Sequence, residues 1–187
     1  MVINLKILFL SDIHGICNNL EYIDKIIQTE KINKLVVLGD LYYCDSIYNN
    51  DDRYIVDKKI VGQFLSKYRN ILICMRGNCD SDIEVKISNF PICNSLGIIY
   101  VDNIPIYITH GNEYNKYNNT KITNSVLVYG HEHIPYIENH NNMLYINVGS
   151  ISLPRNNNKP TYMIYQNKEF TIYDIDNNIV NKCKIGI

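Results

Sequence analysis

The first half of the chain alternates short apolar runs with stretches of helical periodicity. Apolar runs within residues 5–10, 35–38 and 71–75 predict three strands buried on both faces, because such strands show no alternation of apolar and polar positions. Apolar residues three and four positions apart predict helices over residues 20–27 and 56–68. This order of strands and helices predicts right-handed crossovers and a mostly parallel sheet.

The second half of the chain consists mainly of predicted strands. Residues 96–101 and 104–109 flank Asp102-Asn103, a pair typical of a hairpin turn. Further apolar runs predict strands at residues 126–129, 134–138, 143–148, 162–166, 170–173 and 179–185. So many strands, with helices in the first half, predict an α/β fold of two packed sheets with helices outside. The length fits one domain, which we predict over residues 1–187.

Composition and charge exclude several classes of protein. Apolar residues make up 46% and charged residues 20% of the chain, as in ordinary soluble globular proteins. The net charge of -1 provides no basic field for nucleic acid, and no segment approaches the ~18 uncharged apolar residues of a membrane span. The N-terminal apolar run is short and lacks a small-residue cleavage site, which favours a cytoplasmic protein.

Five of the predicted strands end in polar residues that can bind a metal ion. In open α/β sheets the functional crevice lies outside the carboxyl ends of the strands, so these segments are expected to meet. Four of the five histidines lie in them. The five segments are Ser11-Asp12-Ile13-His14-Gly15, Gly39-Asp40, Arg76-Gly77-Asn78-Cys79-Asp80, Thr109-His110-Gly111 and Gly130-His131-Glu132-His133.

The mixture of carboxylate, imidazole and amide ligands suits Mn²⁺, Fe or Zn²⁺ better than Ca²⁺ or Mg²⁺ alone. Seven side chains are too many for one ion, but with one bridging carboxylate they supply four ligands to each of two ions. Two metals about 3.5–4 Å apart can lower the pKa of a shared water from 15.7 towards about 7. The resulting metal-bridging hydroxide would attack in line, which predicts hydrolysis of phosphate esters.

The motifs resemble those of a known family. Five of them are similar, in order and spacing, to the calcineurin-like metallophosphoesterase signature: Asp12-x-His14, Gly39-Asp40, Gly77-Asn78, His110-Gly111 and Gly130-His131-x-His133. Longer runs resemble the small YfcE-type bacterial phosphodiesterases, at residues 11–15, 76–80, 128–131 and 147–150. The resemblance covers nearly the whole chain and its total length.

The resemblance implies a four-layer α/β/β/α sandwich that holds two divalent metal ions. The first ion would be bound by Asp12, His14, Asp40 and His133. The second would be bound by Asp40, Asn78, His110 and His131, with Asp40 bridging. Mn²⁺ is the usual activating ion in such enzymes, with Fe, Zn, Ni or Mg as alternatives. The predicted catalytic residues are Asp40, Asn78 and His110.

Two further residues are expected to line the substrate site. Cys79 stands where the wider family often has histidine, and a thiol is a poorer acid–base partner near neutral pH, so we expect weak catalysis of poor leaving groups. Arg76 could bind substrate phosphate or pair with a nearby acid such as Asp80.

The function predicted by these residues is hydrolysis of a small organic or nucleotide phosphodiester. A phosphomonoesterase of the same fold is one alternative. A protein-interaction scaffold similar to the retromer subunit Vps29 is another, although such scaffolds have degraded ligands and His14 is present here. Small enzymes of this type are often dimers, so a homodimer is a further expectation.

Overall fold

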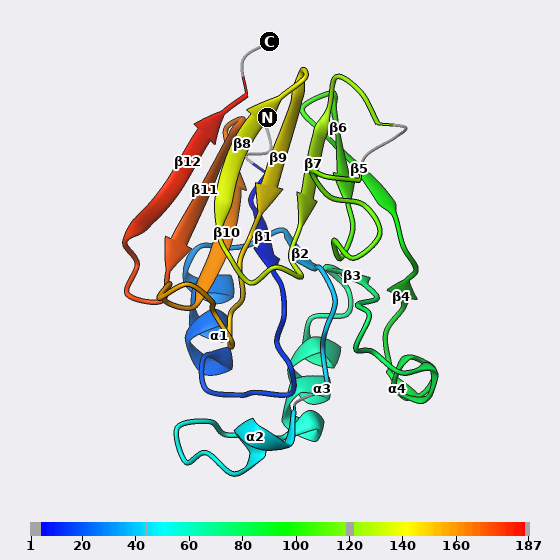
Figure 1. The fold of residues 1–187 in the computed structure, drawn as a ribbon, viewed down its shortest axis with the longest axis vertical. Helices are drawn as coiled ribbons and strands as arrows, with labels where there is room; N and C mark the ends of the chain where they lie inside the picture. Colours follow the sequence, from blue (N-terminus) through cyan, green and yellow to red (C-terminus); the bar gives the residue numbers. More distant parts are fainter. Residues whose placement is uncertain (1–4, 44, 119–121, 186–187) are drawn as a thin grey trace.

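The computed structural model describes residues 5–43, 45–118 and 122–185, and it contains two β-sheets (Figure 1). The first sheet has seven strands. In spatial order they are β12 (Ile179–Lys184), β11 (Glu169–Asp174), β10 (Thr161–Gln166), β1 (Ile7–Leu10), β2 (Lys34–Val37), β3 (Leu72–Met75) and β4 (Ile92–Cys93). Strands β1 to β4 pair in parallel, as predicted for the first half of the chain, whereas β10 to β12 pair antiparallel to one another and β10 pairs antiparallel to β1.

The second sheet has five strands and lies against the first. In spatial order they are β5 (Gly97–Val101), β6 (Ile104–Ile108), β7 (Val126–Tyr129), β9 (Met143–Asn147) and β8 (Tyr136–His140). Strands β5 and β6 form the predicted hairpin. Asp102 and Asn103 at its turn both have positive φ, 52° and 64°, which matches the right-handed twist of the two strands.

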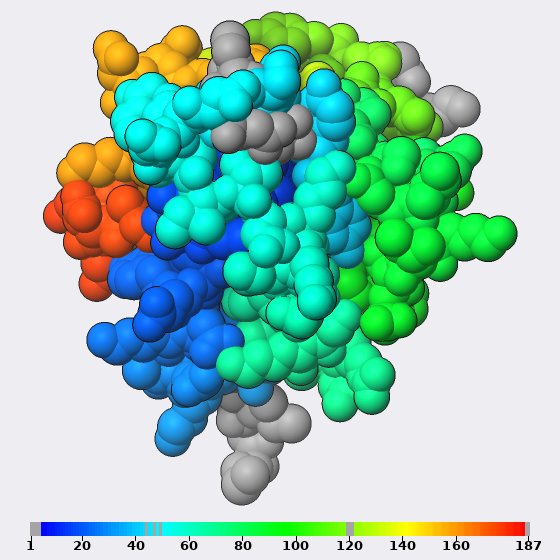
Figure 2. Space-filling view, turned by 90° about the horizontal axis from the view of Figure 1, so that it is seen from below, coloured from blue at the N-terminus to red at the C-terminus, as the bar shows by residue number. Residues whose placement is uncertain are grey.

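Four helices occur in the described residues: α1 (Leu20–Thr29), α2 (Ser46–Asn49), α3 (Lys58–Lys67) and α4 (Asp82–Ile87). Apolar side chains of α1 and α3 pack on the outer face of the seven-stranded sheet. In Figure 2, the blue segment that includes α1 lies beside the teal segment that includes α3. None of the described helices is long and apolar enough to cross a bilayer.

A second hydrophobic core lies between the two sheets. It joins side chains such as Phe9 and Val36 of the first sheet to Ile108 and Val128 of the second. On the opposite face of the second sheet, Ile122 packs with Leu127, Tyr129, Met143 and Tyr145. The α/β fold of two packed sheets flanked by helices is therefore confirmed.

Three elements were not predicted from the sequence: α2, α4 and β4. The start of α3 is also later than predicted, at Lys58, because Asp57 caps the helix by accepting hydrogen bonds from the amides of Lys59 and Ile60.

Candidate metal centre

The candidate ligands meet at the carboxyl ends of five strands, as predicted. They follow β1, β2, β3, β6 and β7. Five of the seven have positive φ although none is glycine, which is uncommon and concentrates at functional sites. These five are Asp12, His14, Asp40, His131 and His133, with φ between 53° and 66°.

Asp12, His14 and His133 form one half of the cluster, and all three are buried. The Nε2 atoms of His14 and His133 are 3.3 Å apart. Asp12 Oδ1 lies 3.3 Å from His133 Nε2 and 3.9 Å from His14 Nε2. Side-chain donor atoms of these three residues are therefore close enough to bind one ion.

Asp40 and His110 connect this half to a second group of ligands. Asp40 Oδ2 lies 3.6 Å from His14 Nε2 and 3.4 Å from His110 Nε2. His110 Nε2 is in turn 3.0 Å from Asn78 Oδ1 and 3.2 Å from His131 Nδ1. Asp40 thus lies between the two groups, where a bridging carboxylate is expected.

Backbone carbonyls orient three of the imidazole rings. The Nδ1 atoms of His14, His110 and His133 lie 2.7, 2.8 and 2.5 Å from the carbonyl oxygens of Tyr43, Leu38 and Leu153. Each Nδ1–H donates to its carbonyl, so in the neutral imidazole Nε2 would present its lone pair to the cluster. Such fixing of the tautomer is characteristic of metal-binding histidines.

Unpaired donor atoms make this site fit for a cation. In neutral imidazoles oriented this way, the facing Nε2 atoms of His14 and His133 cannot hydrogen bond to each other. Among the described residues, no donor forms a conventional hydrogen bond with the fully buried Asp12 Oδ1 while His133, 3.3 Å away, is neutral. A buried carboxylate oxygen without a donor is costly, and a bound cation would satisfy both it and the lone pairs.

In the metal-free site, the carboxylates and imidazoles shift each other's pKa values. Burial acts to raise the pKa of Asp40, but the contact with His110 outweighs it and holds that pKa well below its usual range. Burial acts to lower the pKa of His110, but Asp40 and Asp12 raise it to about 9. The pKa of His131 is lowered, by burial first and then by the charge of His110.

Asp80 is a functional residue whose role was missed at the sequence level. Its carboxylate is buried and accepts three backbone hydrogen bonds, from Asp40 (3.0 Å), Leu41 (2.7 Å) and Gly77 (2.8 Å). It therefore holds together the two loops that carry Asp40 and Asn78. The sequence feature that could have indicated this role is the position of Asp80 in the Arg76–Asp80 motif.

Ser150 supports the other half of the cluster. Its Oγ donates to the Asp12 carbonyl at 2.8 Å and accepts from the amides of Ser152 and Leu153. Since the Leu153 carbonyl orients His133, Ser150 positions two candidate ligands at once.

Glycine is required at two points of close approach. A Cβ on Gly77 would lie 2.1 Å from Asp40 Oδ1 and 2.2 Å from the Asp40 amide nitrogen. A Cβ on Gly130 would lie 1.8 Å from Ser11 Oγ and 2.5 Å from Asp12 Oδ2. Both glycines let one ligand loop pack directly against another.

Arg76 and Cys79 both lie beside the cluster. Arg76 pairs with the exposed Asp82 at 2.6 Å and donates to the Asp80 carbonyl, so the acid that it contacts is Asp82 and not the Asp80 carboxylate. The amide of Cys79 donates to Asp40 Oδ1 at 2.8 Å. Burial, reinforced by Asp40, raises the pKa of the Cys79 thiol to about 12 in the metal-free protein.

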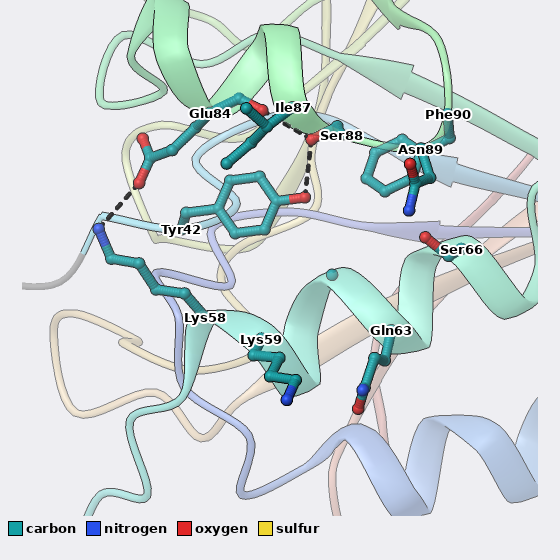
Figure 3. Close-up of a pocket in the computed structure, with 11 residues that line it drawn as sticks. Tyr42, Lys58, Lys59, Gln63, Ser66, Glu84, Ile87, Ser88, Asn89 and Phe90 are labelled. Atoms are coloured by element: carbon teal, nitrogen blue, oxygen red, sulfur yellow. Dashed lines mark hydrogen bonds and ion pairs between the residues drawn. The ribbon is translucent and has the colours of Figure 1, made fainter.

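Two hollows lie near these loops. A polar hollow of 410 Å³ opens beside Asn78 and is lined further by Arg76, Gly77, Asn94, Ser95, Asn112 and Glu113. A second, more apolar cavity of 590 Å³ lies between α3 and α4, and none of the seven candidate ligands lines it (Figure 3). The hollow beside Asn78 is therefore the one placed to receive a group bound at the cluster.

Carboxylate, imidazole and amide donors that converge at the strand ends of a two-sheet α/β sandwich define a metal-binding hydrolase. The chain belongs to the calcineurin-like phosphoesterase superfamily, whose domain matches residues 5–169. The resemblance found in the motifs is thereby confirmed.

Individual relatives support the same assignment. The chain is 28% identical over 184 residues to phosphodiesterase YfcE of Escherichia coli K12, covering 97% of this chain and 99% of that protein. The solved structure of the Escherichia coli phosphoesterase YfcE superposes with a TM-score of 0.86 at 27% identity, covering 97% of this chain and all of that one. Vps29 from Cryptosporidium parvum gives a TM-score of 0.61 at 17% identity, covering 97% and 99%, a likeness of fold alone.

Proposed function

We propose that the protein is a dinuclear metal-dependent phosphodiesterase that acts on small organic or nucleotide phosphodiesters. The observation that carries this proposal is the position of Asp40, with Oδ2 between His14 and His110 of the two ligand groups. Similarity to phosphodiesterase YfcE over 97% of the chain supports the class of ester.

In the proposed site, Asp40 would be a ligand common to both ions. Asp12, His14 and His133 would complete the first ion's ligands, whereas Asn78, His110 and His131 would complete the second's. A pair of divalent ions, Mn²⁺ in this proposal, would supply an acidified water and offset negative charge on the phosphate oxygens. The retained His14 supports an enzyme over a scaffold with degraded ligands.

The protein's own residues would orient the ester and limit proton transfer. Asn78 lies at the junction of the ligand cluster and the polar hollow, so the hollow would hold one ester group of the substrate. The Cys79 thiol is a weak acid, so it would protonate a departing alkoxide poorly. We therefore propose diesters with good leaving groups as the preferred substrates over monoesters.

The central test compares two matched carboxamide substitutions. Protein loaded with Mn²⁺ should hydrolyse an activated aryl phosphodiester, and Asp40→Asn should abolish this activity. Asp176→Asn removes a carboxylate from a surface pair with Lys159 and should leave the activity unchanged. Equal rates for the wild type and Asp40→Asn would contradict the proposal.

A second measurement addresses the ester preference. Rates for a series of aryl phosphodiesters should fall steeply as the pKa of the leaving phenol rises, because little proton donation is available from Cys79. The diester should also be hydrolysed faster than the monoester of the same phenol. A faster monoester reaction would favour the phosphomonoesterase alternative.

A further inference from the structure

The cavity between α3 and α4 has the size of a site for a small organic molecule. Its volume is 590 Å³, within the range of ~300–1,000 Å³ that is usual for such pockets. Its walls are largely apolar: Figure 3 shows Ile87 reaching from α4 toward the ring of Tyr42, with Phe90 nearby. Ile87 is 69% exposed, so the cavity is open to solvent along α4.

Gly62 keeps this cavity open from the side of α3. Glycine is among the least favourable residues in the interior of a helix, so its presence there calls for a reason. A Cβ on Gly62 would meet only the Tyr42 ring, at 3.7 Å or more, which is ordinary contact, and its φ is not positive. Neither backbone conformation nor packing requires glycine here, whereas a larger side chain would occupy the cavity.

The charges around the rim favour an anionic ligand. Lys58 is neutralised by Glu84 at 2.8 Å, which closes one end of the cavity. Lys59 also lines the cavity, and no carboxylate of the described residues forms an ion pair with it. Gln63 and Ser66 add hydrogen-bonding groups along α3.

Hydrogen bonds at both ends of α4 connect the wall of the cavity to the segment that carries Asp40. Tyr42 follows Asp40 by two residues, and its hydroxyl bonds to Ser88 Oγ at 2.9 Å, just after α4. Asp80, just before α4, accepts the amide hydrogens of Asp40 and Leu41. No residue of α4 is buried, so polar contacts hold this helix more than packing does. A ligand that alters the spacing of α3 and α4 would therefore move Asp40.

We propose that this cavity is an effector site for a small molecule with an apolar, aromatic body and one anionic group. The body would lie between Gly62, Ile87 and Phe90, and the side chain of Lys59, which points away from Ile87 in Figure 3, would turn to bring its ammonium to the anion. Occupancy would change the rate at the metal centre through the Tyr42 and Asp80 contacts.

The binding arm of the test uses 8-anilinonaphthalene-1-sulfonate, a fluorescent aromatic anion, with the full chain. We expect one saturable site whose affinity falls about tenfold or more in Gly62→Leu and in Lys59→Glu. Lys34→Glu makes the same charge change at an exposed position outside the cavity and should bind as the wild type does. Lys59→Glu, at an exposed position, keeps the test decisive if Gly62→Leu does not fold.

The activity arm adds the probe to the Mn²⁺-loaded enzyme. This arm rests on the proposed function, whereas the binding arm does not, so an inactive preparation would count only against the function. The probe should change kcat/KM by about fivefold or more in the wild type and leave it unchanged in Gly62→Leu.

Three results would overturn the proposal. The first is probe binding that neither variant weakens. The second is saturable binding in the cavity that leaves kcat/KM unchanged. The third is sedimentation that shows a dimer lost in Gly62→Leu, because a second copy would then be the occupant of the cavity.

Discussion

His14 and His133 face each other with their Nε2 atoms 3.3 Å apart, while each ring is fixed by donation from Nδ1 to a backbone carbonyl. When both imidazoles are neutral, their two lone pairs are thereby held together next to the buried Oδ1 of Asp12. This arrangement requires backbone strain, because Asp12, His14 and His133 all have positive φ. A bound cation reverses the unfavourable electrostatics, so metal binding and stability are coupled.

Metal binding is therefore expected to stabilise the folded chain. At a free Mn²⁺ concentration of about 100 times Kd, one site adds about 2.7 kcal/mol to the free energy of unfolding. That corresponds to a rise in Tm of roughly 5–10 °C over the EDTA-treated protein for a chain of this length. Differential scanning calorimetry measures the change. His14→Ala should remove much of the rise and the exposed His140→Ala none of it; an identical Tm in Mn²⁺ and EDTA would contradict the coupling.

The raised pKa of His110 gives a pH dependence with a defined sign. Its pKa in the folded, metal-free protein is about 9, above the ordinary value of 6.5. The resulting stabilisation is fully present below pH 6.5 and is lost as the pH rises through about 9. The pKa of His133 is also raised and acts in the same direction, whereas that of His131 is lowered and opposes it. Urea unfolding in EDTA between pH 6 and 9.5 measures this loss.

Metal affinity should show the opposite trend over the same pH range. Ligand imidazoles must lose their protons before they bind an ion, so Mn²⁺ competes with protons at His110 and affinity rises with pH. Isothermal titration calorimetry in buffers of different ionisation enthalpy should detect proton release. His110→Gln should flatten both profiles; profiles unchanged by this substitution would show that another group titrates.

The strand-end ligands could be predicted from the sequence because each is a local feature. An apolar run followed by Asp40 or His110, beside a glycine, places a ligand without knowledge of the rest of the chain. The role of Asp80 could not be predicted this way, since its partners Asp40 and Leu41 lie about 40 residues away. Nor could the carbonyl of Leu153, because a backbone acceptor leaves no trace in residue identity.

The unpredicted helix α4 has a related explanation. Ile83 and Ile87 are 72% and 69% exposed, so its apolar residues do not form a buried stripe that periodicity can detect. Its signal was the pair Ser81 and Glu84, which form a capping box in the structure.

Asp80→Asn should weaken metal binding although Asp80 is not itself a proposed ligand. An amide cannot accept all three backbone hydrogen bonds that the carboxylate receives, and its NH₂ group would face one of the amide donors. Substitutions that disturb the orientation of metal ligands typically cost about 10–100-fold in affinity or activity. The expected loss of unfolding free energy is about 1–3 kcal/mol.

Mn²⁺ titration measures the loss of metal affinity in Asp80→Asn, and urea unfolding measures the loss of stability. Asp176→Asn is the control for both measurements. Unchanged Mn²⁺ affinity in Asp80→Asn would show that Asp80 does not position Asp40.

Gly77→Ala and Gly62→Ala are the same chemical change with opposite expected results. At Gly77 the new Cβ would overlap the side chain and amide of Asp40, so the loop must shift, at a cost of about 1–3 kcal/mol. The shift displaces the proposed bridging carboxylate, so phosphodiesterase activity should fall about 100-fold or more. At Gly62 the Cβ makes ordinary contact with Tyr42 in a helix interior, which should stabilise the protein by about 0.5–1 kcal/mol. Urea unfolding and the aryl diester assay on both variants test the pair, and full activity in Gly77→Ala would mean that the close approach of the two loops is dispensable.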